Sequence, residues 1–157
     1  MGTTTKTIDV RVPVRVAYNQ WTQFEDFPKF MEGVNEVHQM DDKRLKWNAT
    51  VGGKQQEWTA EITEQMPDKR IAWRATAGEE NAGVVTFHHL DEDRTRVTLQ
   101  MSYEPEGMTE KIGDMTGFMD RRLQKSLDQF KEFIESRGSE TGAWRGEIDN
   151  HPNASSS

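Results

Sequence analysis

Polar and apolar residues alternate almost without interruption between Val34 and Tyr103, and this period of two constrains the fold more than any other feature of the sequence. Short turn sequences such as Gly52-Gly53 and Asp91-Glu92-Asp93 interrupt the alternation at regular intervals. Short strands that are joined by tight turns form an antiparallel meander, and such a sheet buries one of its two faces. The alternation therefore predicts a strand at each of the segments 34–40, 44–51, 55–65, 69–75, 82–90 and 95–104.

The two faces of this predicted sheet differ in composition. One face carries charged and hydroxyl-bearing side chains, including Glu61 and Arg74, which we expect to be neighbours across a hairpin that turns at Pro67-Asp68. A slip of one residue would turn these charges inward, so the pattern determines the register of the strands. The other face is predicted to lie inside, and it consists of Leu45, Trp47, Ala49, Val51, Trp58, Ala60, Ile62, Ile71, Trp73, Ala75, Val85, Phe87, Val97, Leu99, Met101 and Tyr103.

An N-terminal strand and two short helices are predicted before the meander. Alternation over residues 4–12 indicates a half-buried strand that ends before Pro13. Apolar residues at spacings of three and four then predict a short amphipathic helix, since proline suits the first position of a helix. A second short helix is expected around Pro28, and it ends near Gly33.

The last predicted element is a long helix. Apolar residues at helical spacing run from Thr109, a suitable N-cap, to Arg137, and Gly138 follows as a stop. The apolar face of the sheet is the only large apolar surface available, so this helix is predicted to cover it. Gly113 and Gly117 each cost the helix up to about 1 kcal/mol relative to alanine. They mark either a place where another group approaches the helix backbone or close packing on a bulky tryptophan or phenylalanine.

The length of 157 residues suits one compact domain, which we place at residues 1–137. Residues 138–157 are polar and rich in small side chains, so they are predicted to form a mostly disordered tail. A disordered tail has no need of large apolar side chains. Trp144 and Ile148 are therefore candidates for docking on the domain.

Composition excludes several classes of protein. The absence of cysteine excludes disulfides, thiol nucleophiles and thiolate metal sites. No apolar run is long enough to cross a bilayer, and the N-terminus lacks the layout of a signal peptide, so we expect no membrane insertion and a cytoplasmic location. The net charge of −7 would repel nucleic acid and anionic lipid, so neither is an expected partner.

The sequence offers little catalytic chemistry. His88 and His89 are adjacent in a predicted strand, so they point to opposite faces and cannot chelate one ion together. Metal-ligand spacings, serine nucleophile motifs and phosphate-binding loops are absent, so no metal and no cofactor are predicted. Tyr103 and His89 are the inward groups able to donate or accept a proton, which makes them the catalytic candidates.

Aromatic and thioether side chains gather on the predicted inner face, with small residues such as Ala49, Ala60 and Ala75 between them. Such a wall adapts to an apolar molecule, and indole N–H groups buried in it need a partner that a ligand oxygen or a water supplies. The alternative is a solid core, which the same residues simply fill. The candidate ligand-binding residues are Phe30, Met31, Trp47, Trp58, Trp73, Phe87, Met101, Tyr103, Met115 and Met119.

Three stretches follow one another within the predicted order of strand, short helices, meander and long helix: VPVRVAYNQWTQFEDFPKFMEGV, GGKQQEWTAEITEQMPDKRIAW and AGVVTFHHLDEDRTRVTLQMSYEPEG. Together they resemble the SRPBCC (START/Bet v 1-like) superfamily, in particular the bacterial polyketide cyclase/dehydrase proteins, over roughly residues 4–137. The resemblance implies an α+β helix-grip fold, in which a curved antiparallel sheet wraps around a long C-terminal helix and encloses an elongated cavity. Members bind lipids, quinones, polyketides and other apolar molecules, and some are cyclases or dehydratases.

Three functions follow from these observations, because fold alone does not decide between them. The first is binding of a small hydrophobic molecule, such as a lipid, a quinone or a polyketide-like compound, in the internal cavity. The second is a polyketide cyclase or dehydratase that moves one proton with Tyr103 or His89. The third is a partner-binding or chaperone-like module that uses the outer sheet face or the tail. The sequence selects no particular ligand and no oligomeric state.

Overall fold

A computed structural model of the chain describes residues 2–51, 53–77, 80–104 and 112–148. The sheet contains seven strands in the order β1-β7-β6-β5-β4-β3-β2, and every neighbouring pair is antiparallel. The elements are β1 (Gly2–Val10), α1 (Val14–Trp21), the short 3-10 helix η1 (Phe24–Lys29), β2 (Val34–Gln39), β3 (Arg44–Val51), β4 (Lys54–Met66), β5 (Arg70–Ala77), β6 (Glu80–Asp91), β7 (Arg94–Glu104) and α2 (Ile112–Arg137).

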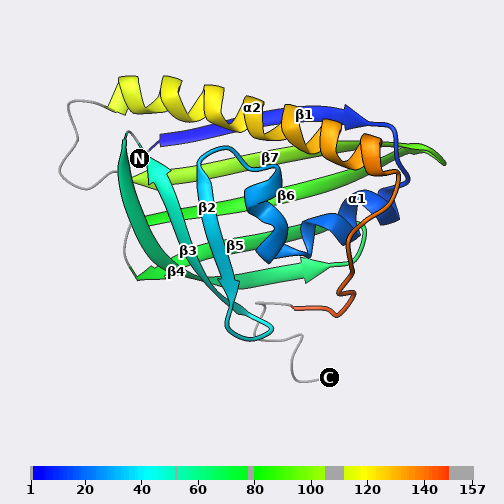
Figure 1. Ribbon diagram of the computed structural model, residues 1–157, viewed down its shortest axis with the longest axis horizontal. Coiled ribbons are helices and arrows are strands. Elements are labelled where there is room, and N and C mark those ends of the chain that lie inside the picture. The colour runs from blue at the N-terminus through cyan, green and yellow to red at the C-terminus, as the bar shows by residue number, and fades with distance from the viewer. Residues whose placement is uncertain (1, 52, 78–79, 105–111, 149–157) are drawn as a thin grey trace.

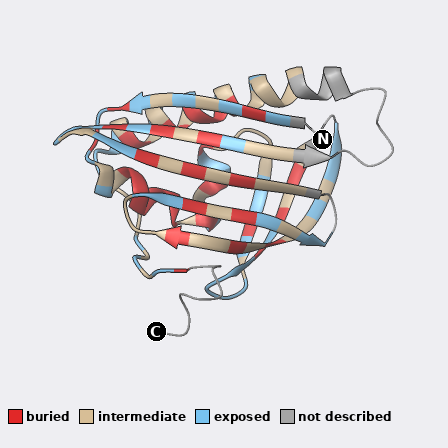
Figure 2. Ribbon diagram, turned by 180° about the vertical axis from the view of Figure 1, so that it is seen from behind, coloured by how far each residue is buried: buried red, intermediate tan, exposed pale blue. Residues whose placement is uncertain are grey.

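The sheet is curved, and its helices lie on one side of it. Figure 1 shows α1 and η1 on the concave side of the sheet and α2 running beside β1. Figure 2 shows the opposite, outer face of the strands turned to the viewer. The predicted α+β architecture, a curved antiparallel sheet with a long C-terminal helix, is confirmed.

Burial alternates along the strands as the sequence predicts. Ile71 and Trp73 on β5 are buried, whereas Arg70 and Arg74 are exposed, and Figure 2 shows the same alternation on neighbouring strands. Glu61 on β4 pairs with Arg74 across the hairpin. The register is therefore set by the cost of turning charged side chains inward.

Aromatic rings from α1, η1 and α2 form a solid core under the concave face. Trp21 meets Phe27, Phe30 and Phe130 with ring centroids 5.4, 5.7 and 5.3 Å apart, and all four side chains are almost completely buried. Tilted and edge-on contacts at these distances are the favourable arrangement for aromatic pairs. This cluster joins the helices to one another and to the end of the sheet that they cover.

A β-bulge in β4 changes which side chains face inward. The pairing with β5 shifts register between Ile62 and Glu64. An extra residue in one strand reverses the alternation beyond it, so Gln65 lies inside with 1% of its surface exposed. A strict period of two would have placed Gln65 outside.

The strand and helix ends differ from the sequence-based expectations by a few residues. β1 ends at Val10 rather than at residue 12. The Val12 carbonyl accepts a hydrogen bond from the Thr95 hydroxyl instead of taking part in strand pairing. Gly138 has a φ of +73° and donates to the Ile134 carbonyl over 2.9 Å, which confirms it as the stop of α2. The N-cap expected at Thr109 lies outside the described residues.

Residues 138–148, here called the strap, take a defined path over α1 to the end of β4, where the sequence predicts a disordered tail (Figure 1). Ile148 has 6% of its surface exposed, and Trp144 packs against the core. Hydrogen bonds and apolar contacts outweigh the low hydrophobicity of this segment. The strap is thus part of the folded unit, and residues 149–157 lie outside the described residues.

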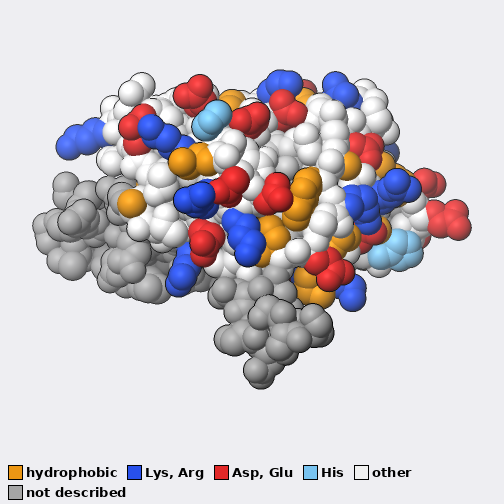
Figure 3. Space-filling view, turned by 90° about the horizontal axis from the view of Figure 1, so that it is seen from below, with side chains coloured by type: hydrophobic (Ala, Val, Ile, Leu, Met, Phe, Trp, Pro, Cys, Tyr) orange, Lys and Arg blue, Asp and Glu red, His pale blue; other side chains and the backbone are white. Residues whose placement is uncertain are grey.

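The surface carries both signs of charge. On the face seen from below in Figure 3, acidic and basic side chains are interspersed, with hydrophobic side chains between them. Within the described residues, no helix combines the length and the apolar character that a bilayer span requires.

The buried hydroxyl of Tyr18 predicts a loss of stability in alkali. Tyr18 has no exposed surface, and its ring meets Phe87 edge-on with centroids 5.4 Å apart. Burial raises the pKa of Tyr18 from 10.0 to about 12, because the phenolate would lose its hydration. The unfolded chain therefore loses this proton at lower pH than the folded chain. The stabilisation is complete below pH 10.0 and is lost as the pH rises toward about 12.

We expect Tyr18→Phe to remove this contribution. Denaturant unfolding at several pH values between about 9 and 11 should show a shallower decline in the free energy of unfolding for the variant than for the wild type. An equally steep decline in both proteins would assign the alkaline loss to another group.

Candidate functional site

Three tryptophans form a stacked array, here called the tryptophan ladder, on the concave face. Trp47 on β3 and Trp58 on β4 are directly paired, and their rings are nearly parallel, with centroids 5.8 Å apart and an interplanar angle of 7°. Trp73 on β5 continues the array, 6.4 Å from Trp47 at an angle of 24°. The ladder therefore spans three neighbouring strands.

Small residues make room for the ladder. Ala60 on β4 lies diagonally between Trp47 and Trp73 and is fully buried. Gly83 on β6 pairs with Trp73, and a Cβ atom there would lie 2.5 Å from Cζ2 of Trp73 and 2.7 Å from Sδ of Met101. The Trp73 indole thus lies against the Gly83 backbone. Sequence reasoning missed Gly83, although an isolated glycine inside a strand is a signal of close approach.

Two polar atoms in the ladder lack a partner. The indole N–H groups of Trp47 and Trp58 are buried, and neither has a hydrogen-bond acceptor among the described residues. A buried donor without an acceptor costs about 1–3 kcal/mol. A ligand or water oxygen within hydrogen-bond distance of either indole N–H would satisfy that donor.

The side chains around the ladder are covered to different degrees. Trp47 and Trp73 have 4% of their surface exposed, whereas Trp58 is half-buried. Met31 in the turn after η1, Met101 on β7 and Met119 on α2 are also half-buried. The candidate residues Trp47, Trp58, Trp73, Met31 and Met101 thus share the hydrophobic surface of the concave side.

Other candidate residues lie elsewhere. Phe30 is buried between Trp21 and Phe130 and fills the helix core. Phe87, 5% exposed, packs on Tyr18 under α1.

The proton-transfer candidates receive little support from their positions. His89 pairs with the buried Thr95, but it is itself exposed near the end of β6, so the residue is open to solvent there. Tyr103 lies on β7 opposite Asn81 and Gly2. The side chains of Tyr103 and Met115 lie outside the described residues.

Arg122 connects α2 to the strands beside the ladder. Its Nε donates to the Glu32 carbonyl over 2.9 Å, and its Nη1 donates to the Thr50 carbonyl over 2.6 Å. Burial lowers the pKa of Arg122, and the nearby Glu32 carboxylate opposes this shift. The guanidinium lies against Gly33, whose φ is +80°. Arg122 therefore attaches α2 to the turn before β2 and to β3.

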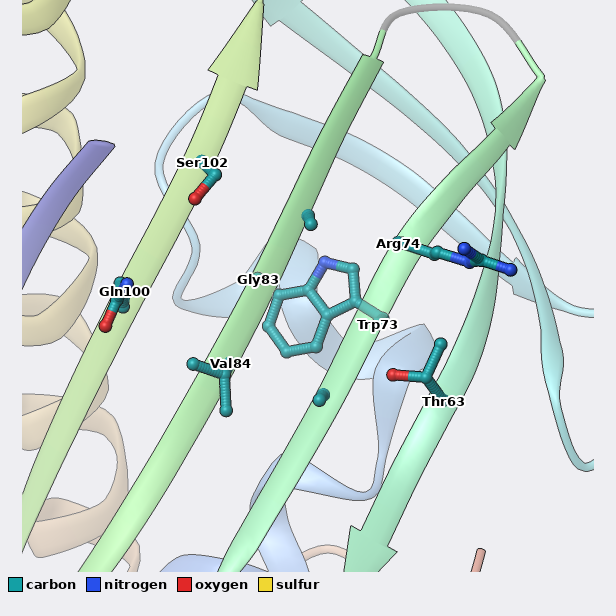
Figure 4. A pocket seen from close by; sticks show the side chains of 9 residues that line it. Thr63, Trp73, Arg74, Gly83, Val84, Gln100 and Ser102 are labelled. Carbon is teal, nitrogen blue, oxygen red and sulfur yellow. The ribbon is translucent and has the colours of Figure 1, made fainter. Parts of the chain in front are cut away.

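The outer face of the sheet carries a shallow hollow of about 320 Å³. Figure 4 shows it across β4 to β7, with Thr63, Arg74 and Val84 among its lining residues. Gln100 and Ser102 line its β7 side. Most of its lining residues lie on the outer face, and Trp73 of the ladder contributes to it beside Gly83. The hollow opens on the outer side, so it is not the internal cavity that the sequence predicts.

The surroundings of Gly117 bear on the two alternatives for the helix glycines, whereas those of Gly113 lie outside the described residues. Among the described residues, a Cβ at this position would meet the Arg121 guanidinium alone, at an ordinary 3.5 Å, and no bulky ring of that part of the chain packs there. We expect Gly117→Ala to raise the free energy of unfolding by up to about 1 kcal/mol, because alanine favours a helix. Thermal and denaturant unfolding would measure the gain, and a loss would show that something does approach this backbone.

Comparison with known proteins agrees with this architecture. Residues 10–132 match the family model described as polyketide cyclase / dehydrase and lipid transport. An uncharacterized 17.2 kDa protein of Streptomyces lincolnensis is 53% identical over 149 residues, which cover 94% of this chain and 99% of that protein.

Solved structures share the fold. An aromatase/cyclase from a Streptomyces species matches with a TM-score of 0.74 and 15% identity, over 90% of this chain and 98% of that one. A START superfamily protein from Mycobacterium smegmatis matches with a TM-score of 0.73 and 12% identity, over 85% and 99% of the two chains. These likenesses confirm the START/Bet v 1-like helix-grip fold. With the family match over most of its length, the chain belongs to the polyketide cyclase/dehydrase and lipid transport family.

Proposed function

We propose that the chain binds a small hydrophobic molecule with an oxygen acceptor against the tryptophan ladder. The observation that carries this proposal is the pair of buried indole N–H groups of Trp47 and Trp58, for which the described part of the chain supplies no acceptor. A lipid, a quinone or a polyketide-like compound has both the apolar body and the oxygen. Membership of a family described by lipid transport supports the same class of ligand.

Two physical terms favour such a complex. Each Å² of apolar surface removed from water contributes roughly 25 cal/mol, and the half-buried Trp58 keeps apolar surface that a ligand would cover. An acceptor oxygen adds a hydrogen bond to a donor that has already lost its hydration. The ladder should therefore prefer a ligand with a correctly placed oxygen over a hydrocarbon of equal size.

A matched pair of ligands tests this preference. 2-Methoxynaphthalene and 2-ethylnaphthalene have the same shape, and only the former has an ether oxygen. Quenching of tryptophan fluorescence should show tighter binding of the methoxy compound by about 3–10-fold, which corresponds to one net hydrogen bond. Both Trp47→Phe and Trp58→Phe remove an N–H donor, and at least one of them should abolish the difference.

Trp144→Phe is the matched control, because Trp144 lies on the strap and belongs to no part of the ladder. It should leave the preference unchanged. Equal binding of both compounds by the wild type, or no quenching by either, would refute the proposal.

A polyketide cyclase or dehydratase is the second candidate, and the family description favours it. Tyr103 on β7 is the remaining proton-transfer candidate, since His89 is exposed. Turnover of a poly-β-ketone that survives Tyr103→Phe unchanged would remove Tyr103 from that role.

The cytoplasmic location and the absence of a nucleic-acid partner stay predictions.

A further inference from the structure

The strap covers a row of polar side chains on α1. Asn19, Gln20 and Thr22 have at most 2% of their surface exposed, which is unusual for such residues on a short helix. The Gln20 amide pairs with Thr141 twice, donating to its hydroxyl over 3.0 Å and accepting from its backbone N–H over 2.9 Å. The Thr22 hydroxyl accepts from the Trp144 backbone N–H over 3.1 Å. These pairings attach the strap to α1 by specific hydrogen bonds.

The far end of the strap is attached to the sheet. β3 pairs with β4 only as far as Arg44 and Glu61, so the edge of β4 beyond them is open to another chain segment. Ile148 occupies this edge through two backbone hydrogen bonds with Gln65, of 2.7 and 2.9 Å. The strap thus adds a short antiparallel bridge to β4.

Arg145 joins both attachments in one side chain. Its Nη1 donates to Oδ1 of Asn19 on α1 over 2.7 Å, and its Nη2 lies 2.8 Å from Oδ2 of Asp68 in the β4–β5 turn. Its guanidinium also lies 5.5 Å from the centroid of the Tyr18 ring. One cation therefore connects the helix, the turn and the aromatic ring beneath them.

The short helix η1, which the strap also holds, contacts the tryptophan ladder. The Thr141 hydroxyl donates to Oδ2 of Asp26 on η1 over 2.6 Å. The next residue, Phe27, meets Trp47 with ring centroids 5.6 Å apart. Movement of α1 and η1 away from the sheet would therefore remove one neighbour of the ladder.

We propose that the strap is a latch, which holds α1 and η1 on the sheet and so controls the release of a ligand from the ladder. The opening event is detachment of residues 138–148, with the sheet and α2 staying in place. The control of ligand release rests on the proposed function, whereas the attachment of α1 by the strap does not.

Hydrogen exchange of the full-length chain tests the latch without any ligand. In Arg145→Ala, the amides of α1 should exchange at least about tenfold faster than in the wild type, while those of Val97 and Leu99 in β7 keep their rates. Arg94→Ala is the matched control, because it also removes an arginine–aspartate pair, at the exposed turn between β6 and β7. It should change neither set of amides.

Unchanged exchange in α1 would overturn the latch. An equal acceleration in α1 and β7 would overturn it as well, because Arg145 would then act on global stability. Ile148→Ala provides a second, independent variant, since it weakens the attachment to β4 without touching Arg145, and it should reproduce the selective acceleration.

Ligand release tests the gating. The release rate of N-phenyl-1-naphthylamine, followed by stopped-flow fluorescence, should rise at least about threefold in Arg145→Ala and stay unchanged in Arg94→Ala. Faster exchange in α1 with an unchanged release rate would refute gating while leaving the ligand site intact. Failure of the wild type to bind this probe or either naphthalene would instead refute the proposed function, and the exchange experiment would still decide the latch.

Discussion

Gly33→Ala should lower the free energy of unfolding by about 2–4 kcal/mol, because the change has two separate costs. Gly33 has a φ of +80°, a conformation that costs other residues roughly 1–2 kcal/mol. Its new Cβ would also overlap the Arg122 guanidinium, which would have to leave the Glu32 and Thr50 carbonyls. A displaced Arg122 no longer connects α2 to the turn before β2 and to β3.

Gly53→Ala separates the two costs. Gly53 has a φ of +86°, and a Cβ there would meet no atom within 4 Å. This control should therefore lose only the backbone part, about 1–2 kcal/mol. Equal losses at the two positions in denaturant unfolding would show that Arg122 accommodates the methyl group freely.

A double variant tests the role of Arg122 directly. If the overlap causes the additional loss, Gly33→Ala should cost less in the Arg122→Ala background than in the wild type, since the obstructing side chain is gone. Additive losses would place the cost of Gly33→Ala in the backbone alone.

Gly83→Ala should lower the free energy of unfolding by about 1–3 kcal/mol, because it overpacks the concave face. The Cβ would lie 2.5 Å from the Trp73 ring and 2.7 Å from the Met101 sulfur, so the indole has to move. Trp73 stacks near Trp47, and a tilt of its ring should change the intrinsic fluorescence and weaken binding at the ladder.

A smaller ring provides the control for this prediction. In the Trp73→Phe background the Cβ has more room, so Gly83→Ala should cost less there than in the wild type. An equal cost in both backgrounds, measured by denaturant unfolding, would contradict the contact between Gly83 and Trp73 as its cause.

The position of Gln65 shows where sequence reasoning stops within a strand. Alternation assigns Trp58, Ala60 and Ile62 to the inner face correctly, and Ala60 and Ile62 are buried. The bulge after Ile62 then brings Gln65 inside, where it pairs with the strap. A bulge leaves no mark in a polar–apolar pattern, because its position depends on how neighbouring strands twist.

The strap shows a second limit. A polar composition predicts disorder because such a segment buries little apolar surface. The strap is held instead by polar groups of Gln20, Asn19 and Asp68, which lie more than seventy residues away in the sequence. Contacts of this kind leave no periodic pattern in the sequence. The apolar residues Trp144 and Ile148 were the features of this segment that indicated docking.

The sequence by itself determined the architecture, because alternation and helical spacing report which face of each element avoids water, and that requirement is local. The meander order of β2 to β7 and the inner set that contains Trp47, Trp58 and Trp73 follow from it, whereas the place of β1 beside β7 and the bulge in β4 do not. Only the tertiary structure decided how these rings stack, which indole N–H groups lack an acceptor, and that Gly33 and Gly83 make room for Arg122 and Trp73. These features depend on distances between side chains from different elements, and such distances exist only once the chain has folded.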